Sequence, residues 1–153
     1  MGSPLFFDDI SVGLVLRSDK PYVVTAGEIV EVAERWDPQP FHLSEAAGAA
    51  SQFGGLVASG LHTIAASLRL GFDAEPVTAD RAGLGMDELR FIRPVRPDDE
   101  LVMATEIIEL RPSVSRPDRG IVRGRREVRN QAGEVVLTYL LTWMVERHPP
   151  GEG

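Results

Sequence analysis

The apolar segment from Leu56 to Leu70 is the feature that most restricts how this chain can fold. Apolar residues recur in it at helical spacing, and they cover most of the circumference of the helix that this spacing predicts. A helix that is apolar almost all round is buried, and this one would be roughly 20 Å long at about 1.5 Å per residue. It could cross a small domain, so a sheet is needed to enclose it.

The second half of the chain supplies such a sheet. Stretches that alternate or run apolar, with β-branched and aromatic residues, are separated by turn signals at 96–99, 111–113 and 130–133; the predicted strands are Met86–Val95, Leu101–Leu110, Gly120–Asn130 and Glu134–Arg147. Short connections favour antiparallel pairing. Alternate residues from Val135 to Val145 are apolar, and we expect this face of the last strand to pack against the helix.

The first half predicts smaller elements. We expect a strand within Leu14–Val24, an amphipathic helix over Thr25–Trp36 that opens with a capping box, and a short helix over Glu45–Ser51. Residues 73–80 are expected to form a loop, and 1–5 and 148–153 frayed tails. The 153 residues suit one domain, and no repeat or linker divides them. The prediction is a single α+β domain over residues 1–153.

Composition excludes several classes of function. The net charge of −7 argues against general binding to nucleic acid. Arginines do concentrate between Arg111 and Arg129, where they could meet phosphates, but a solvated basic hairpin is the favoured interpretation. There is no cysteine, and the histidines lack carboxylates at ligand spacing, so we expect no metal site. No apolar run is long enough to span a membrane and no leader pattern is present, so we expect a cytoplasmic protein.

The segment Trp36–His42 contains the best candidates for chemistry. Pro38 and Pro40 stop the preceding helix and stiffen the chain between Asp37 and His42. A rigid loop that presents a carboxylate and an imidazole is suited to paired acid–base catalysis, because such groups must be held in position before substrate arrives. The alternative is structural: Asp37 would form an Asx turn, and His42 would be a satisfied half-buried residue.

The segment Asp37–His42, placed before a glycine-led helix, resembles the MaoC-like hydratases of the hot-dog fold family. Their motif reads approximately Asp-x-Asn-Pro-x-His, followed by a helix of small residues with a His-Gly step. Asp37, Pro40 and His42 match this motif in identity and spacing, and Gly60 matches the later glycine. Residues 89–99 resemble the strand and turn that follow the central helix in the family. The resemblance covers residues 10 to 147.

The resemblance implies a curved antiparallel sheet around one long helix, and the reversible hydration of trans-2-enoyl-CoA to 3-hydroxyacyl-CoA in fatty acid metabolism. Asp37 and His42 would activate water, and the Gly60 amide would bind the thioester oxygen. Gln39, Ser59 and Arg93 are the candidate substrate-binding residues. Coenzyme A would enter only as part of the substrate, with no other cofactor, and the protein would be a homodimer or a higher homo-oligomer. Arg90, Arg96 and the Arg111–Arg129 cluster are further candidates for its phosphates.

Two departures from the family pattern keep other functions open. Gln39 stands where the family commonly has Asn, and Ser59 where it commonly has His. The rivals are a hot-dog thioesterase and a non-catalytic acyl-CoA-binding or assembly subunit. Gly60 also has a structural interpretation, as a small residue for close packing of helix on sheet. His62, one turn further along, is expected to be a core histidine.

Overall fold

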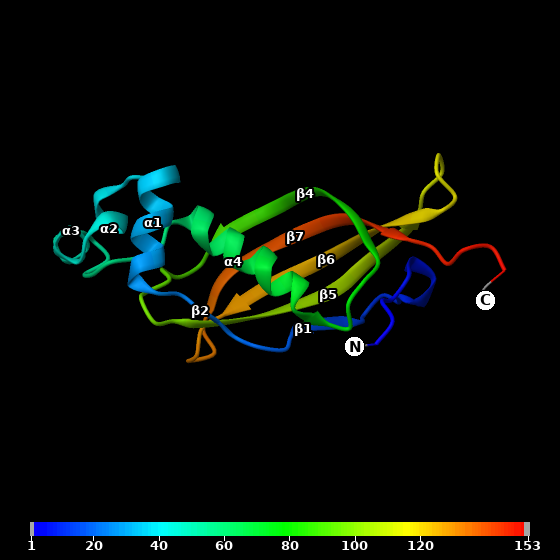
Figure 1. Ribbon diagram of the computed structural model, residues 1–153, viewed down its shortest axis with the longest axis horizontal. Coiled ribbons are helices and arrows are strands. Elements are labelled where there is room, and N and C mark those ends of the chain that lie inside the picture. The colour runs from blue at the N-terminus through cyan, green and yellow to red at the C-terminus, as the bar shows by residue number, and fades with distance from the viewer. Residues whose placement is uncertain (1, 152–153) are drawn as a thin grey trace.

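The computed structural model describes residues 2–151 as one curved antiparallel sheet with a helix across its concave face (Figure 1). The elements in chain order are η1 Phe7–Asp9, β1 Val15–Ser18, β2 Tyr22–Val23, α1 Ala26–Trp36, α2 Pro40–Leu43, α3 Glu45–Ala49, α4 Gly60–Phe72, β3 Ala74–Glu75, β4 Asp80–Phe91, β5 Glu100–Pro112, β6 Arg119–Arg129 and β7 Val135–Glu146. The α+β class and the hot-dog arrangement expected from the sequence are confirmed.

The strand order is β3-β1-β5-β6-β7-β4, and β2 also pairs with β5. Every strand pairing is antiparallel, with Val122 opposite Trp143 between β6 and β7, and Met86 opposite Leu141 between β4 and β7. On β7 the predicted inward face is buried from Leu137 to Val145 and forms much of the core. Because β4 follows α4 in the chain but pairs with the last strand, it forms one edge of the sheet.

The predicted elements of the first half mostly form. Thr25 caps α1, since its hydroxyl accepts a hydrogen bond from the Glu28 amide at 3.2 Å, and Ser44 caps α3 through the Ala47 amide at 3.1 Å. The strand expected over 14–24 is divided into β1 and β2 by a bend at residues 19–20. The expected loop at 73–80 contains the two-residue strand β3, which pairs with β1.

The central helix differs from the prediction in where it begins. Residues 56–59 are extended, and α4 starts at Gly60. Their amide groups have partners elsewhere in the chain: the Leu56 amide donates to Glu45 at 3.1 Å, the Val57 amide to the Phe41 carbonyl at 3.2 Å, and the Ala58 amide to the Val95 carbonyl at 2.8 Å. These contacts hold the segment open and leave Ser59 to cap the helix.

The prediction that α4 is buried all round is wrong for the single chain. Its buried face carries polar residues as well as apolar ones; these are His62, Thr63, Ala66, Ser67 and Leu70. The outward face is apolar instead, with Leu61 49%, Leu68 39% and Phe72 78% exposed. This chain therefore leaves uncovered an apolar side of the helix that the sequence predicted to be buried.

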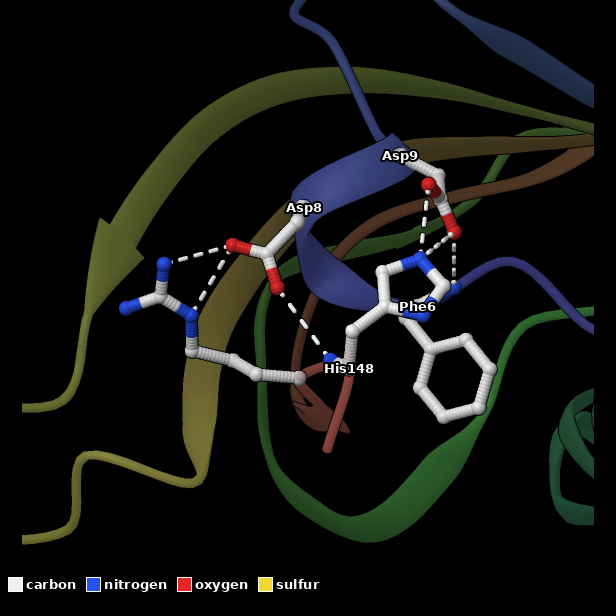
Figure 2. Close-up of polar contacts among 5 residues, drawn as sticks. Phe6, Asp8, Asp9 and His148 are labelled. Carbon is white, nitrogen blue, oxygen red and sulfur yellow. Dashed lines mark hydrogen bonds and ion pairs between the residues drawn. The ribbon is translucent and has the colours of Figure 1, made fainter. Parts of the chain in front are cut away.

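The two ends of the described chain are fastened to each other at the end of the sheet far from α1 (Figures 1 and 2). Asp8 accepts hydrogen bonds from Arg147 and from the His148 amide, and both carboxylate oxygens of Asp9 lie 2.9 Å from His148 Nε2. The Phe6 ring lies 4.4 Å from the His148 ring, centre to centre. His148, which we assigned to a frayed tail, is thus held in place.

The N-terminal tail is held in the same way, because the Leu5 amide donates to the Val77 carbonyl and the Ala79 amide to the Leu5 carbonyl, both at 2.8 Å. Within residues 2–151, no helix is long and apolar enough to cross a membrane.

Candidate active site

At one end of the molecule, α1, α2 and α3 gather beside the start of α4 (Figure 1). Asp37, at the end of α1, and His42, in α2, meet there. Asp37 ends α1 outside the helical region, with φ −152° and ψ 71°, and Gln39 is extended, as expected for a residue that precedes proline. The chain then turns into α2, a single helical turn with Pro40 in its first position and His42 in its third. This turn brings His42 Nε2 to 3.5 Å from Asp37 Oδ2.

A contact with the backbone determines which ring nitrogen of His42 carries the hydrogen and which can act as a base. His42 is buried, and its Nδ1 lies 2.6 Å from the Val57 carbonyl oxygen. A carbonyl oxygen can only accept, so Nδ1 carries the hydrogen and the neutral ring presents a lone pair at Nε2. Neither that lone pair nor the Asp37 carboxylate can donate to the other. A water molecule could donate one hydrogen to each.

Ser59 joins this pair to the central helix. Its hydroxyl donates to Asp37 Oδ2 at 2.6 Å and accepts a hydrogen bond from the Leu61 amide at 3.2 Å. The side chain is fully buried, whereas Asp37 is about one third exposed. The sequence predicts a substrate-binding role for Ser59; the contacts that the structure shows for its hydroxyl are with the Asp37 carboxylate and the N-terminus of α4, and these contacts orient Asp37.

Gly60 follows directly as the first residue of α4. Within the part of the chain that the structure describes, no acceptor is found for its amide, as expected at the first turn of a helix. A β-carbon at this position would lie 2.6 Å from the Phe91 ring. The absence of a side chain therefore serves close packing, which was the structural alternative for Gly60, and it also leaves a polarised amide beside the acid–base pair.

The side chains of the other candidate residues make different contacts. Gln39 is exposed at the start of α2, and Arg93 pairs with Glu134 at 3.2 Å. The Arg96 guanidinium donates to the Phe53 carbonyl at 2.7 Å, and Arg90 donates to the Leu89 carbonyl at 2.8 Å. The Gln39 backbone contacts both residues of the pair, since its amide donates to the Asp37 carbonyl at 2.8 Å and its carbonyl accepts from the His42 amide at 2.9 Å. No side-chain contact of Gln39 or Arg93 with the pair is found among the residues that the structure describes.

Most of the arginine-rich stretch forms a solvated surface on β5 and β6, as favoured from the sequence. Arg119 pairs with Asp118, Arg123 with Asp87 and Glu109, Arg125 with Glu106, and Arg129 with Glu127. Arg126 is the exception, because it is buried on the inner face of the sheet.

His62 lies on the buried face of α4, as expected for a core histidine. Its Nε2 is 3.5 Å from Glu28 Oε1, and Glu28 also accepts a hydrogen bond from the Tyr22 hydroxyl. Burial lowers the pKa of His62, although the charge of Glu28 and a contact with it act in the opposite direction. Among residues 2–151, no group of three or more His, Cys, Asp or Glu side chains is arranged to hold a metal ion.

A long helix on a curved antiparallel sheet, with an Asp–His pair at the N-terminus of the helix, places this protein in the class of hot-dog fold proteins. The model of the MaoC-like domain matches residues 10–125, and the chain belongs to this family. It is 31% identical over 144 residues to the uncharacterised protein YdeM of Bacillus subtilis strain 168, which covers 92% of this chain and 98% of YdeM.

Two solved structures extend the comparison. The MaoC-like dehydratase of Rhodospirillum rubrum is 42% identical with a TM-score of 0.87, over 95% of this chain and 99% of that one. The R-hydratase of Pseudomonas aeruginosa, without ligand, is 26% identical with a TM-score of 0.76, over 95% of this chain and 88% of that one. Family membership therefore supports hydratase or dehydratase chemistry in general, and leaves the substrate open.

Proposed function

We propose that this protein is a hydro-lyase that reversibly adds water to a trans-2-enoyl-CoA to give a 3-hydroxyacyl-CoA. The observation that carries the proposal is the 3.5 Å approach of His42 Nε2 to Asp37 Oδ2, beside the first turn of α4. The chemistry needs a base for water and a donor for the thioester oxygen, since water is a poor nucleophile at neutral pH. His42 Nε2 and the Gly60 amide are the groups that we propose for these two roles.

In the proposed reaction, water lies between His42 Nε2 and the Asp37 carboxylate. Nε2 takes one proton as the water oxygen bonds to C3, and the electron pair of the C2–C3 double bond moves towards the thioester, whose oxygen accepts a hydrogen bond from the Gly60 amide. The imidazolium is stabilised by the neighbouring carboxylate. The proton then passes to C2, so that both hydrogens of water end in the product and both side chains return to their starting state.

The helix supports this arrangement electrostatically. Charge that develops on the thioester oxygen would lie at the N-terminus of α4, where free amides and the helix dipole favour an anion. Losing one such donor typically costs about 3 kcal/mol in the transition state. No metal or redox cofactor has a step in this reaction, and coenzyme A is present only as the carrier of the acyl group.

We also propose that the protein works as a homodimer. The edge strand β4 is exposed along most of its length and carries Leu84 and Met86, and the outward face of α4 carries Leu61, Leu68 and Phe72. A long apolar edge strand exposes unpaired backbone groups and invites pairing with another chain. Antiparallel pairing of β4 with its copy would cover this edge and the apolar face of α4 together, which suits a two-fold interface.

Incubation with a panel of trans-2-enoyl-CoA esters tests the proposed reaction. Hydration removes the absorbance of the conjugated enoyl thioester without releasing free thiol, and the product is a 3-hydroxyacyl-CoA. Release of thiol would instead identify a thioesterase, and loss of neither signal across the panel would leave a binding or assembly role.

A further inference from the structure

A cavity of about 530 Å³ lies at the other end of α4 from the Asp37–His42 pair. Its walls come from the last turns of α4, from the segment that follows, from the start of β4 and from the inner faces of β5, β6 and β7. The lining is mostly apolar and includes Leu68, Phe72, Val77, Leu141 and Trp143. This volume is in the range of small-molecule sites, and the proposed hydration does not use it.

The cavity contains a buried cation. Arg126 lines it and is only 7% exposed. Its Nε donates to the Thr105 hydroxyl and its Nη1 to the Tyr139 hydroxyl, both at 3.1 Å. Tyr139 is hydrogen-bonded in turn to Ser67 at 2.7 Å. These partners are neutral, so they satisfy hydrogen-bonding groups without balancing the charge.

Among the described side chains, those of residues 2–74 and 76–151, no carboxylate lies within 4.0 Å of the Arg126 guanidinium, and no acceptor is found for its Nη2. Another charged group of the cavity is the Asp80 carboxylate, which accepts a hydrogen bond from Trp143 at 3.0 Å; burial raises the pKa of Asp80, while the Arg126 charge acts to lower it. Arg81 pairs with Glu146 at 3.0 Å. Arg126 therefore interacts with Asp80 only at longer range, and a buried charge without a direct partner is costly, since arginine is almost never buried unless it is paired.

The packing beside Nη2 keeps it accessible. A β-carbon on Gly71 would lie 3.1 Å from Nη2, so the glycine leaves room where a larger residue would press on the guanidinium. The free side of Arg126 is therefore directed at a space walled mainly by apolar side chains. A ligand that fits both features has an aliphatic chain and a terminal carboxylate, which the planar guanidinium can bind through two parallel hydrogen bonds.

We propose that this cavity is a binding site for an aliphatic carboxylate, with Arg126 as the group that recognises the charge. The carboxylate has two possible sources: a free carboxylic acid, or the far end of an acyl group whose thioester lies at Gly60. The second source rests on the proposed function. Gly60 and Gly71 are eleven positions apart in one helix, so such a chain would span about 16 Å.

Calorimetric titration with octanoate, and with 1-octanol as its uncharged counterpart, tests the site on the wild-type protein. We expect octanoate to bind at least tenfold more tightly, since hydrogen bonds between charged partners add about this factor. Arg126→Met should abolish the difference. Arg125→Met is the matched control: it removes the neighbouring guanidinium, which is exposed and paired with Glu106, and should leave octanoate binding unchanged.

Equal affinity for octanoate and octanol, or no binding of either, would overturn the proposal. If Arg126→Met does not fold, Gly71→Ala provides a second variant; its methyl group would press on Nη2, and octanoate affinity should fall. Unchanged octanoate affinity in a folded Arg126→Met variant would also refute the site.

The two sources are separated by competition. If octanoate inhibits turnover competitively, and a terminal carboxylate on the enoyl chain raises kcat/KM in the wild type but not in Arg126→Met, the site holds the end of the acyl group. If octanoate binds without competing, the ligand is a free carboxylate. Octanoate binding by a protein that hydrates no enoyl-CoA would refute the proposed function and leave this site supported.

Discussion

Ser59→Ala should damage both the stability and the activity of the protein, because one hydroxyl group makes two contacts. It caps α4 through the Leu61 amide, and it donates to Asp37 Oδ2 at 2.6 Å. Replacing a serine cap by alanine costs about 1 kcal/mol. A hydrogen bond to a charged group adds about 1.5–3 kcal/mol, and we take less than that because Asp37 is partly exposed to water.

The sum is about 2 kcal/mol, which for a domain of this size corresponds to a fall in Tm of about 4–8 °C. Ser44→Ala is the matched control, since Ser44 caps α3 through the Ala47 amide and no carboxylate contact is found for its hydroxyl among residues 2–151. It should lower Tm by only about 2–4 °C. Thermal unfolding by calorimetry measures both values on the same scale.

Activity separates the two roles of Ser59 more sharply. Without its hydroxyl, Asp37 loses the bond that orients its carboxylate towards His42, and we expect kcat on the best enoyl-CoA to fall about tenfold, which is about 1.4 kcal/mol. Ser44→Ala should keep its rate. If the Ser59→Ala variant keeps a wild-type rate and loses no more stability than Ser44→Ala, then Ser59 is a helix cap alone and the positioning role is refuted.

Three further predictions concern other parts of the account. Gly60→Ala would place its β-carbon 2.6 Å from the far end of the Phe91 ring, which is 54% exposed and can turn aside, so we expect a loss of stability of only about 1 kcal/mol, and Phe91→Ala in the same chain should remove it; a fall in Tm that Phe91→Ala does not relieve would contradict this packing. Burial lowers the pKa of His62 from 6.5, so around and below that pH the unfolded state binds more protons than the folded state, and the free energy of unfolding should fall as the pH drops through 6.5. Denaturant titrations over a series of pH values measure this, and His62→Gln should reduce the dependence of the free energy of unfolding on pH in that range. The same pH dependence in the variant would show that His62 is not its cause. Leu84→Lys should convert the proposed dimer to monomer in light scattering, whereas Val114→Lys at an exposed hairpin tip should not; a Leu84→Lys protein that stays dimeric would remove β4 from the interface.

Local patterns were sufficient to predict the elements whose signals are contained in their own sequence. The capping box at Thr25 and the spacing of the residues after it identified α1, and the alternation in β7 identified its buried face. The start of α4 could not be found in this way. Residues 56–59 look helical, but their amides bind Glu45, Phe41 and Val95, which are distant in sequence.

The orientation of α4 was missed for a related reason. Its apolar stripe predicts burial, but the sequence of one chain does not say what covers it, and within this chain Leu61 and Leu68 are left at the surface. Hydrophobicity at helical spacing is equally consistent with a core and with an interface. The sheet is faced by the side that contains His62, Thr63 and Ser67.

The sequence identified Asp37 and His42 as a possible pair because two prolines fix the geometry between them. It did not identify the bond from Ser59 to Asp37, which joins residues on either side of α2 and α3. It also missed Arg126, which was hidden among exposed arginines. The alternation along β6 could have identified it, because every second residue from Gly120 to Val128 lies on the buried face and Arg126 is one of them.

The most direct test of the central claim compares the hydration rates of the wild type, Asp37→Asn and His42→Ala on the best enoyl-CoA of the panel. Asp37→Asn removes the negative charge beside the imidazole, and His42→Ala removes the base. Each folded variant should lose a hundredfold or more in kcat, in line with general acid–base catalysis. A rate within a few fold of wild type in either one would contradict the proposal that these two side chains activate water together.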